Sequence, residues 1–173
     1  MSKIICETSL EGFFYKELMA LNQTLSNPAD QEFIYYGSSV MDDLAKSEKL
    51  FEYSEGRFKN KILGEKLLAS QKLNDLARAR ELKDIGDTSL VICSIFEKSF
   101  NPKIIDVSYY IDIGKIAYEQ LNGFVPNALD RQNFYFELSE QIIKLIEIMK
   151  TVSKTFSSNE NFSSFNLELK KTS

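Results

Sequence analysis

The sequence predicts an all-α protein, a single-domain bundle of about six helices with a short C-terminal tail. The chain has 173 residues, which is enough for one sizeable core. Apolar residues recur every three or four positions along most of it, as they do on one face of a helix. Three prolines and seven glycines are too few for the many turns of an all-β protein. We therefore expect a helical bundle domain at 1–156 and a flexible or loosely docked tail at 157–173.

The first two helices are expected on either side of an Asn-Pro boundary. Thr8 or Ser9 is suited to cap the first helix. Its apolar stripe comprises Leu10, Phe13, Phe14, Leu18, Leu21 and Leu25. Asn27 as a cap and Pro28 in the first helical position predict the start of the second helix, whose interior Gly37 favours a kink or an early end. The apolar residues of this second helix are Phe33, Tyr36, Val40, Met41 and Leu44.

The third and fourth helices are predicted to meet at a short turn. The third runs from about Arg57 to Lys72, with Phe58, Ile62, Leu63, Leu67 and Leu68 pointing inward. Asn74 or Asp75 can cap the fourth, which is expected to reach about Phe100 before Asn101-Pro102 stops it. Each of these helices therefore has an apolar face and a recognisable end.

The last two helices are separated by glycine and proline. Asp106 or Ser108 starts the fifth, which runs from Tyr109 to Asn122 and ends at Gly123. The sixth extends from about Leu129 to Lys154, and its apolar residues cover well over half of its circumference. Two interpretations follow: the sixth helix is the central helix of the bundle, or part of its apolar face is exposed and pairs with a second copy or another protein. The candidate interface residues are Leu138, Ile142, Leu145, Met149 and Val152.

Composition and missing motifs exclude several classes of function. Without histidine, the chain lacks the usual general base and the commonest transition-metal ligand. Neither a P-loop nor a G-x-G-x-x-G motif is present. A net charge of −4 argues against a nucleic-acid partner. We expect no catalytic residue, no cofactor and no metal site.

Local sequence features also bear on the location of the protein. The chain begins without an apolar run long enough for a signal peptide, and no stretch is long enough to span a membrane. Cys93 lies among apolar residues, which predicts a buried, inert thiol. We therefore expect a cytoplasmic protein that is not inserted in a membrane.

One group of polar and aromatic residues is the best candidate for a specific site. If the fourth and fifth helices pack side by side, Gly86 and Gly114 would let their backbones come close, because a glycine inside a helix costs about 1 kcal/mol relative to alanine and needs a reason. The candidate pocket residues are Arg80, Asp87, Tyr109, Tyr110 and Asp112. Three interpretations remain open: a buried polar tether that sets helix register, a ligand or partner pocket, and acid–base catalysis by Asp87 with a tyrosine.

The same stretch resembles a family of uncharacterised helical proteins from bacteria. The resemblance rests on I-G-D-T-S-L at 85–90, S-I-F-E-K-S-F at 94–100 and V-S-Y-Y-I-D-I-G-K-I-A-Y at 107–118, within a core that reads I-G-D followed by Y-Y-x-x-x-G. It covers roughly residues 42–121. The resemblance implies a bacterial, soluble, helical protein and carries over no catalytic residue.

Taken together, these features favour a non-enzymatic protein-interaction or regulatory module that self-associates, with a homodimer through the sixth helix as the first expectation. The alternative is a small-ligand-binding helical protein with a polar pocket between the fourth and fifth helices. A cavity with convergent polar groups would favour the alternative, and a closed, fully hydrogen-bonded cluster would argue against it.

Overall fold

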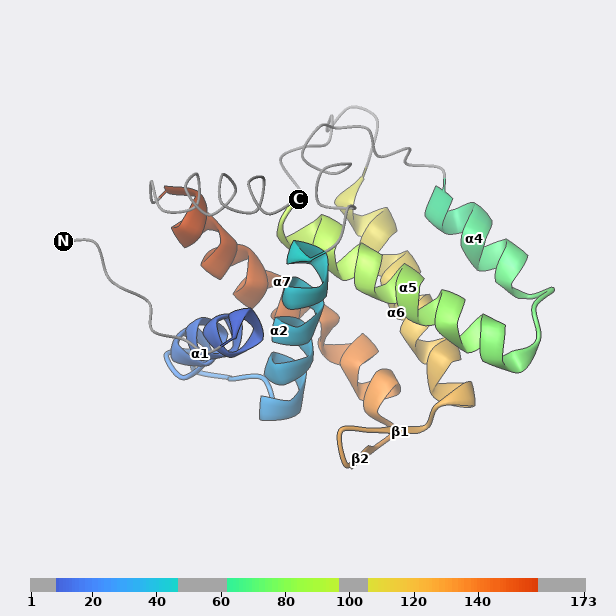
Figure 1. The fold of residues 1–173 in the computed structure, drawn as a ribbon, viewed down its shortest axis with the longest axis horizontal. Helices are drawn as coiled ribbons and strands as arrows, with labels where there is room; N and C mark the ends of the chain where they lie inside the picture. Colours follow the sequence, from blue (N-terminus) through green and yellow to red (C-terminus); the bar gives the residue numbers. More distant parts are fainter. Residues whose placement is uncertain (1–8, 47–61, 97–105, 159–173) are drawn as a thin grey trace.

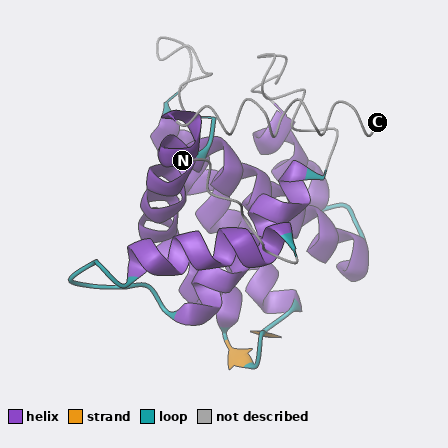
Figure 2. Ribbon diagram, turned by 60° about the vertical axis from the view of Figure 1, so that its left-hand side comes forward, coloured by secondary structure: helices purple, strands orange, loops and turns teal. Residues whose placement is uncertain are grey.

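The computed structural model describes residues 9–46, 62–96 and 106–158, and these form helices almost throughout (Figures 1 and 2). The prediction of an all-α bundle is confirmed. The elements are α1 (Leu10–Asn22), α2 (Gln31–Ala45), α4 (Ile62–Ser70), α5 (Asp75–Ser94), α6 (Val107–Phe124), β1 (Asn127–Ala128), β2 (Arg131–Gln132) and α7 (Phe134–Ser158). The tail predicted at 157–173 lies outside the described residues from position 159 onward.

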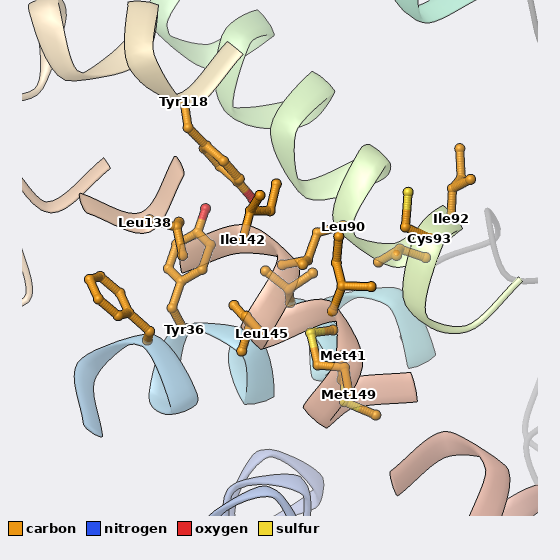
Figure 3. Close-up of a cluster of buried hydrophobic side chains, with 14 of the residues drawn as sticks. Tyr36, Met41, Leu90, Ile92, Cys93, Tyr118, Leu138, Ile142, Leu145 and Met149 are labelled. Atoms are coloured by element: carbon orange, nitrogen blue, oxygen red, sulfur yellow. The ribbon is translucent and has the colours of Figure 1, made fainter. Parts of the chain in front are cut away.

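Helix α7 runs through the middle of the bundle, with α1 and α2 on one side and α5 and α6 on the other (Figure 1). These neighbours cover the apolar stripe of α7, which contains the five candidate interface residues. Val152 is 6% exposed, and the other four have no exposed surface: Leu138, Ile142, Leu145 and Met149. Figure 3 shows Leu145 and Met149 inside the apolar cluster, beside Met41 of α2. The prediction that this stripe pairs with a second copy is therefore wrong, because the chain covers it by itself.

Short polar side chains begin three of the helices, as predicted. The Ser9 hydroxyl accepts a hydrogen bond from the Gly12 amide at the start of α1, at 3.0 Å. Asn74 caps α5 and Asp106 caps α6 in the same way. Each cap satisfies a backbone N–H that has no partner within its helix.

Helix α2 starts later than predicted. Its N-cap is Asp30 rather than Asn27, and the chain before it is closed by Asn22, whose side chain donates to the carbonyl of Ala29 and accepts from the amide of the same residue. These two bonds, at 2.9 and 2.8 Å, keep the loop turned back onto α1. Gly37 does not end the helix, which continues to Ala45.

A hairpin occupies the position where the sixth helix was expected to begin. Leu129 and Asp130 have φ angles of 50° and 57° and form the turn between β1 and β2, so α7 begins only at Phe134. Positive φ at both turn positions is usually signalled by Asn-Gly or Asp-Gly, and this turn contains no glycine. The sequence was therefore interpreted as the start of the sixth helix at about Leu129.

Arg131 links this hairpin to α2 and α7. Its guanidinium pairs with Asp30 at 2.7 Å, donates from Nε to Glu137 at 2.7 Å, and lies 4.7 Å from the ring centroid of Phe33. The carboxylate of Asp30 is thereby turned toward Arg131, and no side-chain capping bond is formed at the start of α2. One cation thus joins the N-terminal ends of α2 and α7.

The described part of α5 is shorter than predicted. The helix ends at Ser94 instead of Phe100, and positions 97–100 lie outside the described residues. Helix α4 is described from Ile62, so the predicted first turn at 57–61 also lies outside. Helix α4 lies at one edge of the bundle, beside α5 (Figure 1). Two ion pairs from Lys66, to Glu81 and Asp84, join α4 to α5.

Candidate functional site

Asp87 is the centre of a polar cluster between four helices. One carboxylate oxygen accepts hydrogen bonds from the hydroxyls of Tyr36 on α2 and Tyr118 on α6, at 2.5 and 2.9 Å. The other oxygen pairs with the ammonium of Lys83, one turn earlier on α5, at 2.6 Å. The ring of Tyr135 on α7 stacks on Tyr118, with 6.0 Å between ring centroids. We call these five residues the Asp87 cluster.

The cluster is closed on its aromatic side and partly open on its charged side. Tyr36, Tyr118 and Tyr135 are buried, whereas the side chains of Asp87 and Lys83 are 21% and 43% exposed. Figure 3 shows Tyr36 and Tyr118 approaching each other from α2 and α6. The ammonium of Lys83 also lies 5.3 Å from the ring centroid of Tyr36. Water therefore reaches the ion pair but not the phenol rings.

Gly86 and Gly114 lie in the contact between α5 and α6. A Cβ atom on Gly86 would fall 2.5 Å from the ring of Tyr118, so only glycine leaves room for that ring. A Cβ on Gly114 would fall 2.9 Å from the Cβ of Ser89. Gly86 therefore leaves room for the ring of Tyr118, whose hydroxyl donates to the neighbouring Asp87, and Gly114 leaves room for Ser89.

The protonation states in the cluster follow from burial and from the carboxylate. Burial raises the pKa of Tyr36 and of Tyr118 well above the ordinary tyrosine value, and the negative charge of Asp87 raises it further. Partial burial lowers the pKa of Lys83, but the charge of Asp87 and its hydrogen bond outweigh that effect and the pKa is raised. The phenols are therefore neutral donors and the lysine is a cation at neutral pH. None of these three groups is poised as a base or a nucleophile.

The predicted pocket residues do not converge around Asp87. Arg80 and Asp112 are exposed, and Tyr109 is 46% exposed with its hydroxyl near Gly64 of α4. Tyr110 is buried, and it precedes Tyr118 by eight residues, which is about 12 Å along a helix. The prediction of a pocket lined jointly by Arg80, Asp87, Tyr109 and Tyr110 is therefore wrong in its membership, because α5 and α6 pack in a register that brings Tyr118 to Asp87.

Tyr110 lies instead near Cys93, at the C-terminal end of α5. Burial raises the pKa of its phenol to about 12, with smaller contributions from Tyr109 and Cys93. The thiol of Cys93 is buried, as expected from its apolar neighbours in the sequence.

Sequence reasoning missed three tyrosines of the cluster. Tyr36 was assigned to the apolar stripe of its helix and Tyr118 was given no role. Tyr135 lies at the start of α7, a helix that was expected to begin at about Leu129. One signal was available for Tyr118: it follows Gly114 by one helical turn, so both lie on the face of α6 that approaches α5. For Tyr36, on a distant helix, no local pattern indicates the contact.

The alkaline titration of the tyrosines provides a test of these protonation states. Because the pKa of Tyr36 and Tyr118 is raised in the folded chain, their contribution to stability is complete below pH ~10 and is lost as the pH rises above that value. We expect ultraviolet absorbance to show that Tyr36 and Tyr118 ionise only as the chain unfolds. Reversible ionisation of all eight tyrosines near pH ~10 in the folded protein would contradict this.

A second feature of the surface is a group of exposed leucines where α4 turns into α5. Leu68 is 68% exposed, Leu73 is 43% exposed and Leu76 is 64% exposed, and the two larger values exceed that of every other large apolar side chain in the described residues. The prediction that Leu68 points inward is wrong. We call the three residues the α4–α5 corner.

Further observations concern metals and membranes. Within residues 9–46, 62–96 and 106–158, no three side chains of histidine, cysteine, aspartate or glutamate gather in a way that would hold a metal ion. No helix in that part of the chain combines the length and the apolar character that a membrane crossing requires.

Comparison with known proteins adds no relative. No family model matches the chain, and neither a curated protein nor a solved structure shows significant similarity to it. The resemblance to helical bacterial proteins therefore stays a prediction.

Proposed function

We propose that this chain is a non-enzymatic protein-interaction module that binds through the α4–α5 corner. The observation that carries the proposal is the exposure of Leu68, Leu73 and Leu76 within nine consecutive residues. Single exposed apolar side chains are normal on a protein surface, but a group of large ones marks an interaction site. Burying them against a partner would remove apolar surface from water, at about 25 cal/mol for each Å².

The Asp87 cluster supports a module without catalysis. Its carboxylate already accepts bonds from two phenols and a lysine, and those phenols have a raised pKa. A catalytic carboxylate or tyrosine would need a free reacting atom and a pKa shifted toward neutrality. The cluster is better suited to joining α2, α5, α6 and α7, which keeps the surface of the bundle in one shape.

Site-specific photo-cross-linking tests the proposal. A photoreactive residue at position 76, in the full chain expressed at its natural level in its own cells, is expected to form a discrete covalent adduct. The adduct should disappear when Leu68→Glu is added, because the new charge prevents apolar contact at the corner. Position 143 on α7 is the matched control, since Ile143 is 50% exposed and lies elsewhere. Absence of an adduct at position 76, or equal labelling at both positions, would refute the proposed function.

A further inference from the structure

We propose that the partner at the α4–α5 corner is a second copy of this chain, related by a twofold axis. The inference rests on the proposed function and names the occupant of that surface. In a twofold contact the same patch faces itself, so a residue on one copy meets a different residue of the same patch on the other. Apolar side chains can pack against an identical set of apolar side chains. The charges around them then decide whether contact between two copies is favoured.

The two charged residues between the leucines of the corner have opposite signs. Lys72 and Asp75 are the only charged residues between Leu68 and Leu76, they stand on either side of Leu73, and both are exposed. The next cation along α5, Arg78, is engaged within its own chain: it donates to Gln120 at 3.1 Å, and its guanidinium lies 5.2 Å from the ring centroid of Phe124. A twofold axis near Leu73 can therefore place Lys72 of each copy opposite Asp75 of the other.

A second exposed apolar stripe provides a contrast. Phe136 and Ile143 on α7 are 48% and 50% exposed, and the exposed charges on either side of Ile143 on the same stripe are Glu140 and Glu147, with Lys154 two turns further along. A twofold contact centred near Ile143 would bring the carboxylates of Glu140 and Glu147 together, which opposes association. The corner carries both signs of charge and greater apolar exposure, so it is the surface that favours a second copy.

The expected dimer is weak. A contact formed by one corner lies at the small end of the range for specific interfaces. We therefore expect a dissociation constant on the order of micromolar, so the dimer should dissociate on dilution. Leu76→Glu should abolish it without loss of the fold, because a glutamate in the first turn of α5 is compatible with the helix dipole. Ile143→Glu is the matched control and should leave the dimer intact.

Charge exchange gives the decisive test by light scattering across a dilution series. Lys72→Glu and Asp75→Lys should each weaken self-association about tenfold or more, because each places like charges together in both halves of a twofold contact. An equimolar mixture of the two variants should associate again, since every pair then joins opposite charges. The double variant K72E/D75K should also dimerise. Recovery in the mixture shows that both single variants are folded.

Each other outcome overturns a defined part of the proposal. A chain that is monomeric at every concentration, yet cross-links from position 76 to a protein of another mass, rules out the second copy and leaves the proposed function standing. A dimer that is indifferent to Leu76→Glu and to both charge variants places self-association elsewhere and refutes the twofold corner contact. Loss of the dimer without recovery in the mixture refutes the pairing of Lys72 with Asp75.

Discussion

Leu145→Glu is expected to unfold the chain. Leu145 has no exposed surface, and one of its methyl groups lies 3.0 Å from the position that a Cβ on Gly37 would occupy. A glutamate there would bring a carboxylate into the contact between α2 and α7 without a partner. An uncompensated buried charge costs about 3–5 kcal/mol, which is comparable with the whole stability of a small domain. Far-ultraviolet circular dichroism and thermal melting should show loss of helix at room temperature or a greatly reduced melting temperature.

The control for this substitution is two residues away on the same helix. Ile143→Glu adds the same charge at a position that is 50% exposed, and its effect should stay within about 0.5 kcal/mol. A Leu145→Glu chain that is fully helical, with a normal melting temperature, would show that α7 is not covered as described. The comparison thus separates the two interpretations of the apolar helix that the sequence left open.

Asp87→Ala is expected to cause the second large loss of stability. The substitution leaves the hydroxyls of Tyr36 and Tyr118 buried without their acceptor. An unsatisfied buried polar group costs about 1–3 kcal/mol, so the two together should lower the free energy of unfolding by about 2–6 kcal/mol. Urea-induced unfolding followed by circular dichroism measures this difference.

Two further variants test whether the loss comes from the phenols. Asp87→Asn keeps an acceptor oxygen near the hydroxyls and should be less destabilising than Asp87→Ala. Tyr118→Phe should cost much less in the Asp87→Ala background than in the natural chain, because its bond to Asp87 is already absent. Strictly additive effects would show that the hydrogen bond from Tyr118 to Asp87 contributes no stability.

Most of the secondary structure could be predicted from local patterns. The spacing of apolar residues locates each helix, and the side chains of Ser9, Asn74 and Asp106 mark three helix starts, because capping involves atoms only two or three residues apart. Prediction failed where distant contacts set the local backbone. Asp30 forms an ion pair with Arg131 and makes no side-chain capping bond to α2. The turn at Leu129 and Asp130 has positive φ angles although it contains no glycine.

The candidate site could be predicted only in part. Gly86 and Asp87 were identifiable, because a glycine inside a helix implies a close neighbour and an adjacent carboxylate needs a donor. The sequence grouped Asp87 with Arg80 and with Tyr109 and Tyr110, which stand together on the neighbouring helix. The donors are instead Tyr118, two turns further along α6, and Tyr36, 51 residues away in the chain. Periodicity identifies the buried face of a helix but not the residue that this face meets.

By itself, the amino-acid sequence determined that the chain is helical, where three of the helices start, and that Gly86 and Gly114 lie against neighbours. These properties depend on interactions within a few residues or on one helix face. The tertiary structure alone decided that α7 is covered on its apolar stripe, that Asp87 joins four helices, and that Leu68, Leu73 and Leu76 stay exposed. The physical reason is that burial depends on how many helices surround a residue. No pattern along a single helix contains that information.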